Sequence, residues 1–344
     1  MKLRLLFLLS LLVNTAFSQD PSITQFYNNP NYINPAYTGV IQNNFRLTSM
    51  YRSQYGMNSR SGKFGLYKTA FVGSDIRIQT TTSGNAATFG FTYINDNSGF
   101  STLSTNYFSM SMGSIIPVSN NSKVSLGLSA GMVSTTLEES FRLGHQWNGT
   151  QWDGSIDLLD DQAINDLSGL TRYPIAGAGI ALLTKYNRTD KFFLGLSANN
   201  LNTPNVSFLE GGSINLAPTF NANMGFNNQV RQEIVLVNNL LARFQGQSYQ
   251  VVANTTINYQ PNFKSNSFNA GVGFRLTNGL NNAVAGESFI LTTGYGVGEF
   301  TVQASVDINT QLDNAIEVAF IYTPAVKTAR IRPLACPDIS LPKF

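Results

Sequence analysis

The sequence predicts an all-β protein, a transmembrane antiparallel β-barrel of the outer-membrane type with about 14 strands. Charged residues make up 12% of the 344-residue chain and aromatic residues another 12%, whereas charged residues are roughly 25% of a soluble domain. Mean hydropathy is near zero. After the first 20 residues, no apolar run reaches the about 18 residues of a transmembrane helix. Strands that alternate apolar and polar residues produce this combination.

The alternation itself is the second observation. In residues 124–132 every second residue is apolar and the others are Ser or Gly, and residues 300–308 alternate in the same way. Period two places each set on one face of a strand. A soluble sandwich usually carries Lys and Glu on its outer face, whereas Gly, Ser, Asn and Thr suit a crowded barrel interior.

Segments of roughly ten residues, the length that a tilted strand needs to cross a bilayer, recur along the chain. They are expected at residues 43–52, 68–80, 86–95, 101–116, 122–137, 172–187, 190–200, 217–227, 232–244, 247–260, 266–277, 286–296, 298–309 and 314–323. This assigns residues 43–323 to the barrel.

The connections between these segments are the third observation. Long ones, such as 53–67, 138–171 and 201–216, alternate with short turns such as 82–85 and 119–122. Outer-membrane barrels have short periplasmic turns and longer external loops. An even number of strands then returns the chain to the side where it began. We therefore expect both termini in the periplasm.

Residues 1–18 have the features of an export signal peptide. Lys2 and Arg4 precede an apolar run, and Ala16 and Ser18 supply the small residues of a cleavage site. The signal predicts export and location in the outer membrane of a Gram-negative bacterium. The chain has one cysteine, Cys336, so no intrachain disulfide can form.

Residues 19–42 form a segment rich in Pro, Asn and Tyr just before the first strand. Proline fixes φ and lacks a donor, and Asn-Pro favours turns, so the segment is expected to be ordered but irregular. We expect it in the periplasm, either plugging the barrel mouth or binding a partner, and the sequence leaves both open. The candidate residues are Gln25, Phe26, Tyr27, Asn34, Pro35 and Tyr37.

The longest external connection, 138–171, holds the only histidine, His145. It is interpreted as a solvated loop helix over the barrel mouth or as a contact surface for a passenger or cap protein. Its candidate contact residues are Trp147, Trp152, Asp157, Asp160 and Asp161. The spacing of these aspartates fits no calcium loop, so no metal site is predicted. The tail, residues 324–344, is interpreted as a disordered periplasmic end or a docking peptide.

No catalytic, cofactor-binding or metal site is predicted, and the chain is not expected to be an enzyme. His145 has no recognisable nucleophile and acid partners, and no phosphate-binding loop or zinc spacing occurs. Gly177 and Gly179 are expected to make room for bulky lumen neighbours. Charged residues on the inward face can pair across a filled lumen or line a channel; they are Arg46, Arg52, Asp75, Arg77, Arg275, Asp307 and Glu317. The net charge of +3 is too small to indicate nucleic acid binding.

The N-terminal segment resembles the start of the PorP/SprF family, outer-membrane components of the type IX secretion system of Bacteroidetes. Its matching residues run Thr24-Gln-Phe-Tyr-Asn-Asn-Pro30 and Tyr32-Ile-Asn-Pro-Ala-Tyr-Thr-Gly39. The similarity continues at residues 51–54, 90–99 and 173–179, with Tyr55 where the family commonly has Trp. The ending, Cys336-Pro337 followed by Lys343-Phe344, is similar to the Cys-Pro-Arg-Phe ending of the family with an insertion.

The resemblance implies a non-enzymatic role in the export or surface anchoring of a specific large passenger protein, such as a gliding adhesin. It implies as partners the C-terminal signal domain of the passenger, the translocon pore protein, and the periplasmic lipoprotein ring and motor. The composition alone also permits an outer-membrane solute channel, and as a distant third an outer-membrane enzyme.

Overall fold

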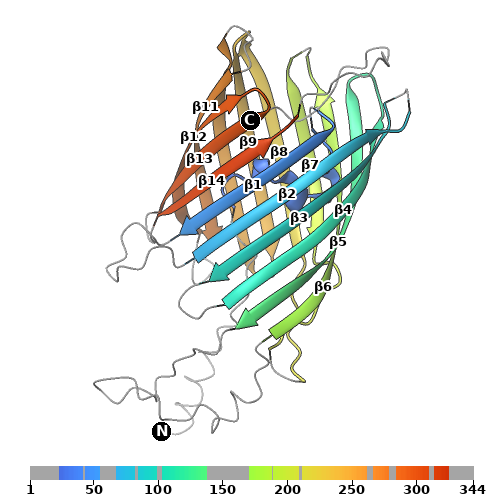
Figure 1. Ribbon diagram of the computed structural model, residues 1–344, viewed down its shortest axis with the longest axis vertical. Coiled ribbons are helices and arrows are strands. Elements are labelled where there is room, and N and C mark those ends of the chain that lie inside the picture. Colours follow the sequence, from blue (N-terminus) through green and yellow to red (C-terminus); the bar gives the residue numbers. More distant parts are fainter. Residues whose placement is uncertain are drawn as a thin grey trace.

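The described residues form a closed antiparallel barrel of 14 strands (Figure 1). Each strand pairs with its neighbours in sequence, and β1 pairs with β14 to close the barrel. The computed structural model describes residues 23–41, 43–54, 67–81, 84–98, 103–137, 170–187, 189–208, 211–261, 266–278, 284–309 and 314–324. The predicted fold class and number of strands are confirmed.

The strand bounds agree closely with the alternating segments of the sequence. They are β1 (Phe45–Gln54), β2 (Tyr67–Gln79), β3 (Ala86–Ser98), β4 (Leu103–Pro117), β5 (Ser122–Leu137), β6 (Leu170–Lys185), β7 (Lys191–Asn199), β8 (Thr219–Arg231), β9 (Ile234–Gln245), β10 (Ser248–Tyr259), β11 (Asn266–Asn278), β12 (Val284–Val297), β13 (Phe300–Asn309) and β14 (Ala315–Tyr322). Three short helical turns precede them: η1 (Phe26–Asn28), α2 (Pro30–Ile33) and η2 (Pro35–Tyr37). Among the described residues, no helix is long and apolar enough to cross a membrane.

The large apolar side chains of the alternating segments point outward. In β5, Leu126 and Leu128 are 45% and 60% exposed, whereas Ser125, whose side chain points into the lumen, is fully buried. The same division holds around the barrel, so the outer wall is an apolar surface that faces lipid.

The connections define two mouths. We number the connections along the chain, so that β1–β2 is the first. The even-numbered connections have between two and six residues, and we call the end of the barrel where they lie the short-turn mouth. The odd-numbered connections border the long-connection mouth, which bears the three longest, residues 55–66, 138–169 and 200–218. β1 begins and β14 ends at the short-turn mouth. The predicted alternation of long and short connections is therefore present, except that some odd connections are also short.

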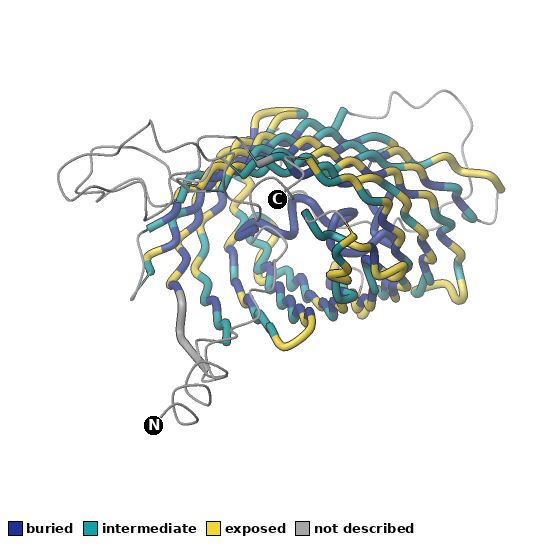
Figure 2. The backbone as a smooth tube through the Cα atoms, turned by 90° about the horizontal axis from the view of Figure 1, so that it is seen from below, coloured by how far each residue is buried: buried dark blue, intermediate teal, exposed yellow. Residues whose placement is uncertain are grey.

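Residues 23–41 lie inside the barrel, and every one of them is buried. Seen along the barrel in Figure 2, this segment is a dark blue tube within the ring of strands. We call residues 23–41 the lumen segment. Of the 19–42 segment expected in the periplasm, residues 19–22 and 42 lie outside the described residues. The described part occupies the lumen.

The inward face is more apolar than the small polar residues of the sequence pattern suggested. Side chains of the wall and of the lumen segment pack into two apolar clusters. The first joins Phe26, Tyr27, Tyr32 and Ile33 to the wall residues Met50, Phe71, Ile94, Leu241, Val252 and Ile290, among others. The second joins Ala36, Tyr37 and Val40 to Ala86, Ile115, Ala181, Leu183 and Phe193. An inward apolar residue is stable here because the lumen segment covers it.

The lipid-facing assignment predicts the effect of one charge at mid-height. Leu128→Arg, near the middle of β5, is expected to lower the free energy of unfolding by about 2–4 kcal/mol, the cost of Arg at the bilayer midplane. The control is Val118→Arg in the β4–β5 turn, at a position that is also exposed; it should cost about 0–1 kcal/mol near the interface. Urea unfolding in phospholipid vesicles measures both, and equal costs would contradict the assignment.

Candidate functional site

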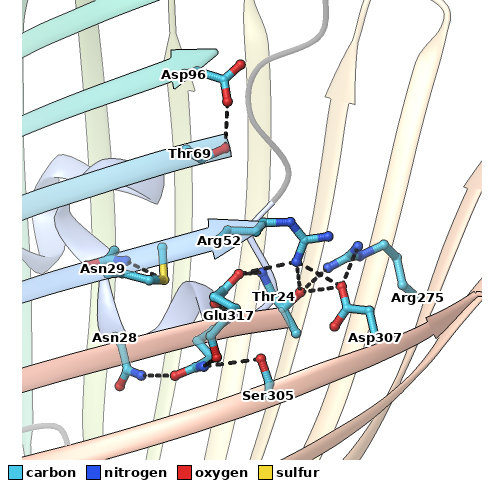
Figure 3. Close-up of polar contacts among 12 residues, drawn as sticks. Thr24, Asn28, Asn29, Arg52, Thr69, Asp96, Arg275, Ser305, Asp307 and Glu317 are labelled. Carbon is cyan, nitrogen blue, oxygen red and sulfur yellow. Dashed lines mark hydrogen bonds and ion pairs between the residues drawn. The ribbon is translucent and has the colours of Figure 1, made fainter. Parts of the chain in front are cut away.

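The candidate site is the filled lumen, and its N-terminal end is a cluster of charged side chains around Thr24 (Figure 3). Arg52 of β1 lies 2.9 Å from Asp307 of β13 and 3.3 Å from Glu317 of β14. Arg275 of β11 lies 3.1 Å from the same Asp307. Two guanidinium groups and two carboxylates are therefore buried together, and their formal charges cancel.

Thr24 completes this cluster with its hydroxyl group. Its Oγ1 donates to Asp307 Oδ2 at 2.7 Å and accepts from Arg52 Nη1 at 2.6 Å. Arg275 Nη2 donates to the same oxygen. Thr24 thus bridges the two arginines and one carboxylate, which come from three different strands.

Glu317 binds the backbone of the lumen segment. Its Oε2 accepts from the Thr24 N–H at 2.9 Å, and its Oε1 accepts from the Gln25 N–H at 2.7 Å. The Gln25 side chain donates to Ser305 Oγ and to the Glu317 carbonyl, both at 3.1 Å. A carboxylate that accepts two backbone N–H groups fixes both the position and the direction of the chain.

The middle of the lumen segment is a turn at Asn34–Pro35–Ala36. Asn34 Oδ1 caps η2 by accepting from the Ala36 N–H at 2.9 Å. Asn34 Nδ2 donates to the carbonyls of Ile180 in β6 at 3.3 Å and Leu196 in β7 at 3.2 Å. On the β5 side, Ser125 Oγ donates to the Ala36 carbonyl at 2.6 Å.

Three glycines of the wall make room for this turn. A Cβ atom at Gly127 of β5 would overlap the Pro35 carbonyl, and one at Gly179 of β6 would overlap Asn34 Oδ1. A Cβ at Gly195 of β7 would overlap the Tyr37 hydroxyl. The close approach of the lumen segment, by its backbone at Gly127 and by its side chains at Gly179 and Gly195, thus favours glycine at these positions. The sequence had indicated such a role for Gly179.

The C-terminal end of the lumen segment is held by a second ion pair. Arg46 of β1 and Asp75 of β2 are directly paired in register and form a bidentate bridge with both N···O distances at 2.8 Å. Asp75 Oδ2 also accepts from the Gly39 N–H at 2.8 Å. Gly39 has φ +69°, a left-handed conformation that favours glycine. Arg77 Nη1 donates to the Ile41 carbonyl at 2.9 Å.

Aromatic side chains anchor the segment between its ends. The Tyr32 ring packs edge-on against Phe71 and Tyr107, with centroids 6.4 and 5.5 Å away, and the Arg243 guanidinium lies 5.6 Å from its centre. Tyr37 packs edge-on against Phe193 at 5.9 Å. The sequence reasoning had not singled out Arg243. Its signal was a charged residue at an inward position of β9.

The structure thus brings most of the residues singled out in the sequence into one site. Gln25, Phe26, Tyr27, Asn34, Pro35 and Tyr37 are all buried in the lumen. The inward charges Arg46, Arg52, Asp75, Arg275, Asp307 and Glu317 pair there with each other or with the segment. Trp147, Trp152, Asp157, Asp160, Asp161, His145 and Cys336 lie outside the described residues. No group of three or more metal-ligating side chains occurs within the described ranges.

A closed antiparallel barrel with an apolar outer wall defines the class, an outer-membrane β-barrel protein. The chain belongs to the PorP/SprF family of type IX secretion system membrane proteins, whose family model matches residues 15–320. No curated protein matches the chain.

Solved structures that are similar to this chain share little of its sequence. The "CymD monoaromatic hydrocarbon channel" is 12% identical, with a TM-score of 0.51 over 86% of this chain and 92% of that chain. A Pseudomonas aeruginosa FadL homologue is 11% identical over 84% and 92%, with a TM-score of 0.45. The Acinetobacter baumannii protein Omp33 is 9% identical over 82% and 98%, with a TM-score of 0.43. At this identity the first of these supports the barrel fold alone.

The charge cluster predicts a large effect for one isosteric substitution. Glu317→Gln leaves two arginines facing a single carboxylate and should lower the free energy of unfolding by about 3–5 kcal/mol, the cost of breaking a buried ion pair. The control, Glu233→Gln in the two-residue β8–β9 turn, removes the same charge away from the lumen. It should change the free energy of unfolding by less than about 0.5 kcal/mol. Denaturant unfolding in detergent micelles compares them; similar values for the two variants would count against the cluster.

Gly127, Gly179 and Gly195, which we call the glycine seat, make room for the turn of the lumen segment. One added methyl group there is predicted to displace the segment. Gly179→Ala should raise the ionic conductance of the purified protein in planar bilayers, because overpacking of about 1–3 kcal/mol opposes docking of Asn34. Gly273→Ala in β11 is the control, since the three atoms nearest to its added methyl group all belong to the β10 residues Ala253 and Asn254. Equal conductance of the two variants would show that the seat does not hold the segment.

Proposed function

We propose that this protein is a non-enzymatic outer-membrane accessory component of type IX secretion. In this proposal it supports the export or surface anchoring of one specific large passenger, such as a gliding adhesin. Membership of the PorP/SprF family supplies the secretion system. The observation that carries the accessory role is the lumen segment, which is buried throughout and bonded to the wall at both ends.

The filled lumen supports anchoring over free conduction by a simple argument. An open aqueous pore leaves its inward charges in contact with water, where they act on passing solutes. Here the inward charges of Arg52, Arg275, Asp307 and Glu317 are bonded to one another and to Thr24 and Gln25. A barrel of this kind is suited to present its rims and connections to other proteins.

The proposed partners follow from the same role. They are the lipid bilayer, a passenger with a C-terminal type IX secretion signal, the translocon pore protein, and the periplasmic lipoprotein ring with its secretion motor. No nucleic acid partner is proposed. The proposed route to the outer membrane is export by the signal peptide of residues 1–18. The connection 138–171 and the tail 324–344 remain proposed contact regions.

The competing proposal is an outer-membrane solute channel. The observation in its favour is that a solved structure with the same fold, 12% identical to this chain, is named a channel. A planar-bilayer recording of the purified protein separates the two. A steady open conductance would overturn the anchoring proposal, and a closed barrel would overturn the channel.

The proposal is tested in cells by replacing the turn of the lumen segment. The triple substitution Asn34→Gly, Pro35→Gly and Ala36→Gly removes the amide that bonds to Ile180 and Leu196 and the ring that fixes φ at residue 35. Barrel insertion should stay intact, because the wall hydrogen bonds are unchanged, while one surface passenger is lost or strongly reduced. Mass spectrometry of surface-labelled proteins measures the passenger.

The matched control is a glycine triplet in an exposed turn. Ser119→Gly, Asn120→Gly and Asn121→Gly, in the β4–β5 turn, alter three residues without touching the lumen segment, and should leave the surface proteome unchanged. A gene deletion gives the reference. If deletion leaves all surface proteins in place and changes solute uptake instead, the secretion role is wrong.

A further inference from the structure

A groove runs along the outer face of the barrel over β9 and β10, where the wall faces lipid. It has a volume of ≈ 540 Å³, and binding sites for small molecules have about 300–1,000 Å³. The side chains at its floor are Asn238, Ala253 and Thr255, and large apolar side chains form its edges. They stand at outward positions of their strands, alternating with buried lumen-facing residues such as Asn239 and Asn254. The groove is therefore open to the bilayer, and the wall separates it from the lumen segment.

Small outward side chains on two neighbouring strands make the floor. Asn238 of β9 and Thr255 of β10 are register partners, and Ala253 is the next outward residue of β10. The strands on either side carry large residues at the same level: Phe226 of β8 pairs with Asn238, and Val272 of β11 pairs with Thr255. The wall is therefore low along β9–β10 and high on both sides.

Both edges of the groove are aromatic. On the β11 side, Phe274 is the register partner of Ala253, and its ring centroid lies 5.1 Å from that of Phe289 in β12. On the β8 side, Phe226 is the register partner of Phe192 in β7. An occupant of the groove thus contacts hydrocarbon on both sides.

The two polar side chains of the floor are bonded within the wall. Thr255 Oγ1 donates to Asn238 Oδ1 at 2.8 Å, and Asn238 Nδ2 donates to the Phe226 carbonyl at 3.4 Å. Protein partners inside a membrane are often held by polar side chains that bond across the interface. Here the polar pair is bonded along the wall instead, which favours an occupant that offers no polar group in return.

The groove lies inside the apolar band of the wall, in the half nearer the short-turn mouth. Asn238 is four residues after β9 begins at Ile234, and Thr255 is four residues before β10 ends at Tyr259. At about 3.4 Å per residue and a tilt of about 40°, both lie about 10 Å from these strand ends. The apolar band of such a barrel is about 25 Å tall. Hydrocarbon chains of the lipids occupy this depth.

We propose that the groove binds one acyl chain of a membrane phospholipid, inserted from the leaflet next to the short-turn mouth. An unfilled groove would forfeit dispersion contacts along its lining, because a void offers no partner atoms. The edges stand on β8 and β11, whose strand axes are about 14 Å apart, and the edge side chains narrow this width further. A helix with its side chains is about 10–12 Å across and fits poorly, whereas a single flexible chain follows the groove.

Photo-crosslinking to lipid tests the proposal. The purified protein is reconstituted in phosphatidylethanolamine vesicles that contain a phosphatidylcholine probe with a diazirine in the middle of one acyl chain. After irradiation, mass spectrometry of the digested protein assigns the labelled residues. Ala253→Phe fills the floor of the groove. The matched control is Ala130→Phe, because Ala130 is also an exposed outward alanine, in β5. Heat-modifiable gel mobility verifies that each variant is folded.

We expect label on the groove residues severalfold above label on the outward residues of β5, both in the wild type and in Ala130→Phe. In Ala253→Phe this excess should be lost. Label spread over the wall in proportion to exposure would overturn the proposal. So would a protein adduct formed in cells by benzoylphenylalanine in place of Val272, because the groove would then hold a partner protein. Secretion is not measured, so the outcome does not depend on the proposed function.

Discussion

Glu317 is a carboxyl group without exposed surface, and the lumen around it has to supply the partners that water would otherwise provide. Removing an ion from water costs several kcal/mol unless other charges and donors replace the water. Arg52 supplies the charge, and the backbone N–H groups of Thr24 and Gln25 supply two donors. The lumen segment is therefore a part of the electrostatics of the wall. The segment donates two hydrogen bonds to Glu317, and Glu317 fixes the segment in return, so the wall and the segment stabilise each other.

This dependence also bears on what the barrel does. Proteins of the same fold include channels, so the fold does not separate conduction from support of secretion. The contents of the lumen make the difference. The inward charges form closed pairs, such as Arg46 with Asp75, and the wall glycines accept a proline turn at backbone contact. These arrangements are specific for a resident peptide segment, which agrees with a secretion-system family better than with a passive pore.

Much of this was readable in the sequence, because period two assigns each residue of a strand to one face. The strands, the lipid-facing residues and the inward charges followed from that rule. The inward apolar residues did not, although consecutive apolar pairs mark them: Phe71 beside Val72, Leu241 beside Leu240, and Ile290 beside Leu291. Such pairs break the alternation where the lumen segment supplies an apolar cover. The path of that segment could not be predicted, because alternation specifies faces and says nothing of how an irregular chain crosses the lumen.

The place of the charge cluster has a consequence for how the protein is assembled. Arg52 and Glu317 are register partners across the seam between the first and the last strand, and Thr24 and Gln25 are bonded over that seam. The hydrogen-bond ladder that closes the barrel is thus the one that Thr24 and Gln25 hold together. The barrel is therefore closed around an N-terminal part of its own chain, and its seam and that segment hold each other in place.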